Sequence, residues 1–147
     1  MSLAQWASNG WLKIHRTSAE EVRNLLAMVR RDLHDALETG ISADWRFGIA
    51  YNAALKLCTI LMYAEGYRPD KNLAHYRTLQ ALPLILGARR KADADYLDAC
   101  RTKRNTVEYD MVGGATCAEA EELIKFVEEL EKDAREWLKK AHPSLLP

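Results

Sequence analysis

The chain has 147 residues, the usual size of a single domain. Hydrophobic residues make up 48% of it and charged residues 29%, which excludes the composition of a disordered chain. Its 21 Lys and Arg residues balance 21 Asp and Glu residues, so no overall positive field attracts nucleic acid. Any contact with RNA or DNA must therefore be local.

The cysteines are odd in number and lack the Cys-x-x-Cys spacing of a metal or redox motif. We expect Cys58, Cys100 and Cys117 to be buried free thiols, which indicates a reducing cytoplasm. The histidines lie far from them, so we expect neither a metal site nor a cofactor. No secretory signal is evident, and the most apolar stretch, residues 49–64, is shorter than the ~20 residues of a membrane helix.

The first predicted helix begins at Thr17 or Ser18, because Glu20 and Glu21 complete a capping-box pattern there. Apolar residues then repeat at intervals of three and four, and Gly40 is expected to end the helix.

The second predicted helix is capped by Ser42 or Asp44 and ends near Glu65. Many of its apolar positions are alanines, so another helix can approach it closely. This pattern places it at the centre of a bundle and also suggests a contact with a second copy of the chain.

The rest of the chain is also predicted to be helical. We expect a short helix over 72–80, a buried apolar connection over 82–86, a helix over about 88–109 that ends before Gly113 and Gly114, and a long helix over 117–141. No alternating apolar run predicts a strand. The sequence therefore indicates one all-α domain, a four- to five-helix bundle with short loops and a core over about 17–141.

The most informative segment lies near the end of the fourth predicted helix. Helical spacing brings Arg101, Arg104 and Asn105 to one face, with Glu108 and Tyr109 one turn further on. Arginine forks suit phosphate oxygens, and Asn and Tyr can bind a ribose or a base. The alternative is a solvated helix face on which Arg104 and Glu108 form an ordinary ion pair.

His75 in the short helix is a second candidate. Its residue type suits a general base, although a histidine beside an apolar segment is more often packed and hydrogen-bonded.

Two segments resemble the HEPN superfamily of prokaryotic type. One is the small-residue helix and its exit turn, residues 50–69, and the other is the run Arg-Asn-Thr-Val-Glu-Tyr-Asp over 104–110. The resemblance implies a HEPN-like helical fold over most of the chain. In catalytic members an Arg, followed four to six residues later by a His, forms a metal-independent ribonuclease site across a dimer interface.

Arg104 and Asn105 match this motif, but Tyr109, Asp110 and Met111 stand where the histidine is expected. A phenol with a pKa near 10 is poorly suited to proton transfer at pH 7. The resemblance therefore implies a homodimer that binds RNA or a nucleotide-bearing partner without efficient catalysis. It also suggests a toxin–antitoxin module with a nucleotidyltransferase antitoxin.

Two alternatives remain open. One is a ribonuclease toxin with a changed site, in which Tyr109 or Glu108 replaces the imidazole. The other is a protein-interaction module that pairs with a nucleotidyltransferase or another helical protein.

Overall fold

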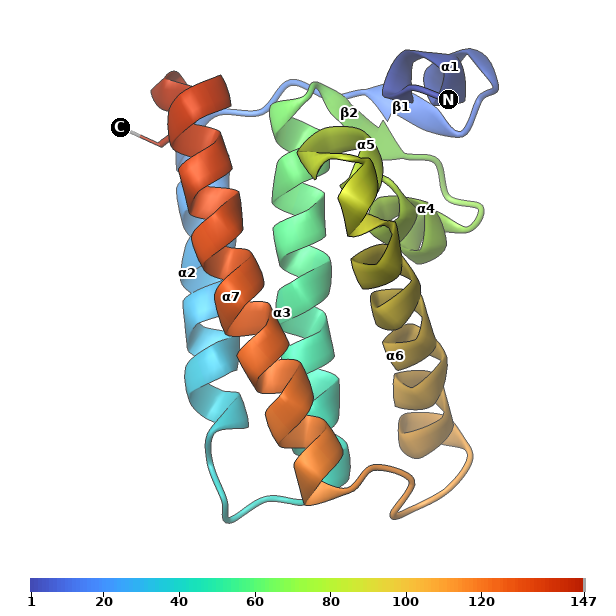
Figure 1. Cartoon of the computed structure of the whole chain (residues 1–147), viewed down its shortest axis with the longest axis vertical. Helices are drawn as coiled ribbons and strands as arrows, with labels where there is room; N and C mark the ends of the chain where they lie inside the picture. Colours follow the sequence, from blue (N-terminus) through green and yellow to red (C-terminus); the bar gives the residue numbers. More distant parts are fainter. Residues whose placement is uncertain (147) are drawn as a thin grey trace.

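A long central helix organises the molecule. The computed structural model describes residues 1–146, and in it α3 (Ala43–Ala64) is packed against α2 (Ala19–Ala36), α6 (Lys91–Tyr109) and α7 (Cys117–Ala141) (Figure 1). The predicted all-α bundle is confirmed.

The small residues of α3 explain its central position. Ala50, Ala53 and Ala54 are completely buried, so neighbouring helices approach the α3 backbone closely. These alanines are used within the chain and are not free to contact a second copy. By length and composition α3 could cross a membrane, but 67% of its apolar stretch is buried in the bundle, as in the core helix of a soluble fold.

Side-chain caps fix where the long helices begin. The Ser18 hydroxyl accepts a hydrogen bond from the Glu21 amide, and the Ser42 hydroxyl accepts one from the Trp45 amide. The end of α2 differs from the prediction, because the helix stops at Ala36 and not at Gly40.

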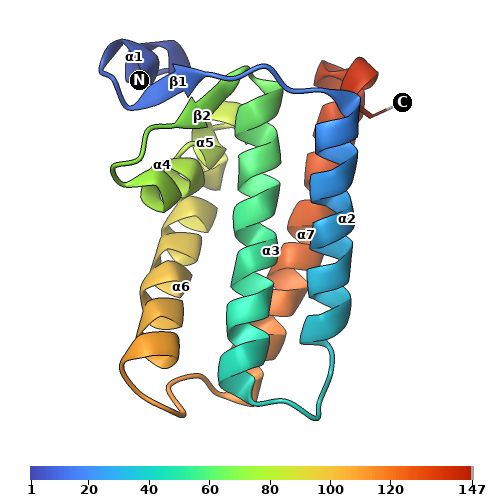
Figure 2. The same cartoon turned by 180° about the vertical axis from the view of Figure 1, so that it is seen from behind.

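The N-terminal segment contains structure that was not predicted. A short helix, α1 (Leu3–Ser8), leads into β1 (Leu12–Ile14), which pairs antiparallel with β2 (Tyr67–Pro69) at one end of the bundle (Figure 2). The expectation of no strand was wrong, because three residues are too few to show an alternating pattern. A second apolar cluster, built around Trp6, holds this sheet against the bundle.

The connection between α3 and α6 also differs in detail. The helix α4 (Ala74–Gln80) starts two residues later than predicted, because Leu73 adopts a left-handed backbone conformation with φ of 53°. The apolar connection is itself a short helix, α5 (Leu82–Leu86), in which Leu82 is buried and the others are half-buried. A 3₁₀ turn, Ala88–Arg90, precedes α6.

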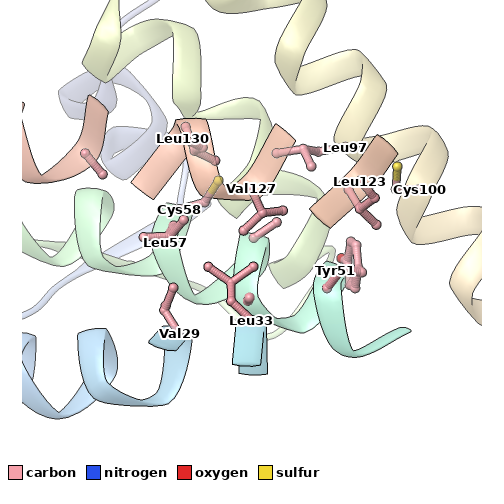
Figure 3. Close-up of a cluster of buried hydrophobic side chains, with 14 of the residues drawn as sticks. Val29, Leu33, Tyr51, Leu57, Cys58, Leu97, Cys100, Leu123, Val127 and Leu130 are labelled. Carbon is pink, nitrogen blue, oxygen red and sulfur yellow. The ribbon is translucent and has the colours of Figure 1, made fainter. Parts of the chain in front are cut away.

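The main core lies where α3 meets α2, α6 and α7. Tyr51, Leu97, Cys100 and Leu123 gather in this part of the core (Figure 3). Cys58 and Cys100 are buried free thiols as predicted. The prediction was wrong for Cys117, which is exposed because it is the first residue of α7.

Candidate phosphate-binding site

Arg104 on α6 is held against α3 by neutral partners. Its Nη2 donates a hydrogen bond to Oδ1 of Asn52 at 3.0 Å, and its Nη1 donates one to Oδ1 of Asn105 at 3.1 Å. The guanidinium carbon lies 5.2 Å from the centre of the Tyr51 ring, and the side chain is only 16% exposed. Two amides and an aromatic ring therefore fix the guanidinium in place.

The positive charge of Arg104 is only partly offset. The nearest carboxylate oxygen, Oε1 of Glu108, is 3.7 Å from Nε, which is too long for a hydrogen bond. Nε itself is buried and has no hydrogen-bond partner within residues 1–146. Arg104 and Glu108 thus form the predicted ion pair, but not the bidentate hydrogen-bonded pair that neutralises an arginine most effectively.

Gly48 gives Glu108 and Arg104 room against α3. A Cβ atom at this position would lie 2.9 Å from Oε1 of Glu108 and 3.8 Å from Cγ of Arg104. The glycine thus permits the close approach of the two side chains to the α3 backbone.

The other two cations of the segment have different surroundings. Nε of Arg101 donates to Oδ1 of Asp98 at 2.8 Å, and Nζ of Lys103 donates to Oε2 of Glu119 on α7 at 2.6 Å. Both side chains are 30% exposed. Lys103 therefore belongs to the α7 side of the helix and is not part of the Arg104 cluster.

Tyr109 is not brought into the cluster. It is the last residue of α6, its side chain is 75% exposed, and it forms no hydrogen bond with the described residues around Arg104. Of the five residues predicted from sequence, Arg104, Asn105 and Glu108 lie together and Arg101 lies one turn away.

His75, the second candidate from the sequence, lies on α4. This helix packs against α6 and α3, and His75 lies in its first turn with an exposed side chain. Partial burial, together with the positive charges of Arg104 and Arg101, lowers the pKa of His75 below its usual value. The lowered pKa favours the neutral imidazole.

The Tyr51 ring packs against the guanidinium of Arg104. It is completely buried, and its hydroxyl has no hydrogen-bond partner in the described part of the chain. Burial raises the pKa of its phenol far above the ordinary value of 10, against the opposing effect of Arg104 and Arg101. Tyr51 thus stays neutral and acts as a packing surface for the guanidinium.

Asn52 was missed as a site residue, whereas His75 was singled out in the sequence by its residue type alone. Asn52 carried a signal, since an amide within an otherwise apolar helix needs a polar partner. Nothing in the sequence places His75 relative to the arginines, because that depends on how α4 packs.

Comparisons of the chain with protein families, curated proteins and solved structures find no match. Within residues 1–146, no group of three or more His, Cys, Asp or Glu side chains is placed to hold a metal ion.

We predict that Asn52→Ala destabilises the protein, because it removes the acceptor that ties Arg104 to α3. The loss should be about 1–2 kcal/mol in the free energy of unfolding, as for a half-buried hydrogen bond to a charged group. Urea unfolding measures it, with Asn24→Ala on the exposed face of α2 as the matched control. Equal stability of the two variants would show that the Asn52–Arg104 bond does not hold α6 against α3.

Proposed function

We propose that this protein binds RNA through its phosphate groups at the Arg101–Arg104 face, formed by Arg101, Arg104 and Asn105 of α6 with Asn52 of α3. One observation carries the proposal: the hydrogen-bond acceptors of Arg104 are neutral amides. A carboxylate is the simplest partner for an arginine whose role is only structural. Arg104 instead donates hydrogen bonds to neutral amides, so its positive charge remains available to an anion.

The chemistry of the face suits a phosphate backbone. Arg101 and Arg104 are three residues apart on one helix, so their side chains are neighbours. Because the whole chain is neutral, such a local pair is the kind of site through which it can bind a polyanion. The resemblance to HEPN proteins, which includes Arg104 and Asn105, agrees with RNA as the ligand and with a toxin–antitoxin context.

Glu108 and Tyr109 are the two candidates to replace the missing imidazole, and their surroundings support binding without efficient cleavage. Oε1 of Glu108 lies 3.7 Å from Nε of Arg104, and Tyr109 stands apart from the cluster with a 75% exposed side chain. His75 is the other candidate base named from the sequence.

A second copy of the chain is also part of the proposal, although not through the alanines of α3. Exposed apolar residues gather at the end of the bundle where the carboxylate of Asp44 accepts hydrogen bonds from the Gly113 and Ala115 amides. Trp45 follows Asp44 on α3, while Met111 and Val112 precede Gly113 in the loop after α6. We propose that this end of the bundle contacts its counterpart in a homodimer.

For RNA binding, we predict that Arg101→Gln lowers affinity by about tenfold, since a hydrogen bond between charged groups contributes roughly 1.5 kcal/mol. The dependence of affinity on salt should also weaken, by about 0.7 in the slope of log K against log salt. Fluorescence anisotropy with a labelled single-stranded RNA measures both quantities.

Lys103→Gln is the matched control for Arg101→Gln. It removes the same charge from the same helix at the same exposure, but on the α7 side. Equal losses in the two variants would contradict a specific face. Arg104→Ala is less suitable, because Arg104 is largely buried and its loss would also disturb the fold.

For catalysis, we predict that the wild-type protein does not cleave a structured RNA efficiently in excess chelator. A well-matched base contributes ~100- to 10,000-fold to such a reaction, and neither Glu108 nor Tyr109 supplies one. Gel analysis of the RNA products measures cleavage. Robust cutting that is lost in His75→Gln would contradict this prediction and identify a ribonuclease with a changed site.

For assembly, we predict a particle of about twice 16.7 kDa in light scattering. Trp45→Ser should shift it toward the monomer, because an exposed indole contributes apolar area to the contact. Ile14→Ser, which changes an exposed apolar residue of β1 at the opposite end of the bundle, is the control. A wild-type protein that is monomeric at micromolar concentration would rule out the dimer.

A further inference from the structure

A cavity lies between α2 and the C-terminal end of α7. Its volume is about 300 Å³, at the lower end of the range for small-molecule sites. The two views of the bundle show α2 and α6 on opposite sides of α3, with the end of α7 beside the start of α2 (Figure 1 and Figure 2). The cavity is therefore separate from the Arg101–Arg104 face on α6.

Three arginines line this cavity, and two of them share one carboxylate. Oε2 of the buried Glu131 lies 3.1 Å from Nε of Arg30 on α2 and 3.2 Å from Nη2 of Arg135 on α7. Arg23, two turns before Arg30, also lines the cavity and forms neither an ion pair nor a hydrogen bond with the described residues. Three guanidinium groups thus have one described carboxylate between them, which leaves two positive charges without a partner.

The arginines also keep hydrogen-bond donors for a ligand. Within residues 1–146, the terminal nitrogens of Arg30 donate no hydrogen bond, and neither does Nη1 of Arg135. Guanidinium N–H groups match the geometry of phosphate oxygens. Glu131 therefore holds two of the arginines in place, while their remaining N–H groups and Arg23 are available to an anion.

Apolar side chains form the rest of the wall. Leu26 and Ala27 of α2 line the cavity together with Leu145 and Leu146. The last two belong to the segment after α7, which contains a 3₁₀ turn, Pro143–Leu145, and they are half-buried against the main core. A ligand that fills the cavity should therefore carry an apolar part next to its anionic group.

The charges beyond the cavity favour a small anion over a polyanion. The groove continues between α2 and α7 into a section where Lys132 is accompanied by Glu128 and Glu131. Asp35 and Glu38 line the section after that, together with His34. Carboxylates along the groove repel the successive phosphates of a nucleic acid strand. The three arginines therefore form an isolated site and not the start of a track for RNA.

We propose that this cavity binds a small phosphate monoester, with the phosphate on Arg23, Arg30 and Arg135 and the apolar substituent on Leu145 and Leu146. Two unpartnered positive charges match the phosphate group of an ester, which carries close to two negative charges at pH 7, better than a carboxylate with one. The site goes beyond the proposed RNA binding and does not depend on it.

Isothermal titration calorimetry of the full chain tests the proposal with phenyl phosphate, inorganic phosphate and benzoate at about pH 7.5, where the ester is mainly a dianion. Phenyl phosphate should bind at one site per chain, about tenfold more tightly than inorganic phosphate because its ring buries apolar area. Benzoate has the same ring but a single charge, and should bind about tenfold more weakly than phenyl phosphate. Phenyl phosphate that does not bind, or binds no more tightly than either of the others, overturns the proposal.

Arg23→Gln should weaken phenyl phosphate binding about tenfold, because a hydrogen bond between charged groups is lost. Since Arg23 has no described partner, this variant should unfold at the wild-type temperature. Arg31→Gln is the matched control and should bind as the wild type. Arg31 is exposed on the same helix, but it pairs with Asp32 and does not line the cavity. Equal losses in the two variants overturn the site.

Leu146→Ser separates the apolar wall from the arginines. It should lower the affinity for phenyl phosphate toward that for inorganic phosphate, while the affinity for inorganic phosphate stays unchanged. An unchanged affinity for phenyl phosphate in this variant would contradict the apolar contact. The RNA affinity of Arg23→Gln should equal that of the wild type. A tenfold fall in RNA affinity in Arg23→Gln would place RNA in the cavity and overturn the assignment to a small ligand.

Discussion

The arrangement of the candidate site depends on one interaction, the hydrogen bond from Arg104 on α6 to Asn52 on α3. It crosses 52 positions of the sequence and ties the site helix to the central helix. The residues around this hydrogen bond accommodate it. Gly48 leaves room beside Glu108, and the Tyr51 ring lies under the guanidinium. The bond therefore links the packing of the bundle to the placement of a cation at its surface.

Burying that cation costs stability, and the structure offsets only part of the cost. Two amide oxygens replace water around the guanidinium, but Nε stays unpartnered and the Glu108 carboxylate is not in hydrogen-bond contact. Elsewhere in the bundle a buried charge is paired directly with an opposite charge. The buried Asp32 accepts a hydrogen bond from Lys56 at 2.6 Å, which is a closely paired charge. The contrast favours a ligand-binding role for Arg104.

Much of the fold could be predicted because helices carry local signals. The caps at Ser18 and Ser42 and the apolar periodicity of the long helices are read within a few residues. Asn52, the polar residue that interrupts an apolar run, also marked a real contact. The small sheet could not be predicted, since its strands pair across more than 50 residues with only three residues each.

The site was predicted in part for the same reason. Spacing along one helix placed Asn105 and Glu108 beside Arg104, which the structure confirms. Spacing could not say that the Tyr109 side chain is 75% exposed, nor where α4 places His75, because both follow from how the helices pack.

The most direct test of the account observes the arginine side chains themselves during an RNA titration, by NMR of the Nε–H groups. The account predicts that the Arg101 and Arg104 resonances shift together as RNA binds. The resonance of Arg46, whose Nε donates to the Ala36 carbonyl in the core at 2.8 Å, should stay unchanged as an internal reference. Unshifted Arg101 and Arg104 resonances at saturating RNA would contradict the account, because the RNA would then be bound elsewhere.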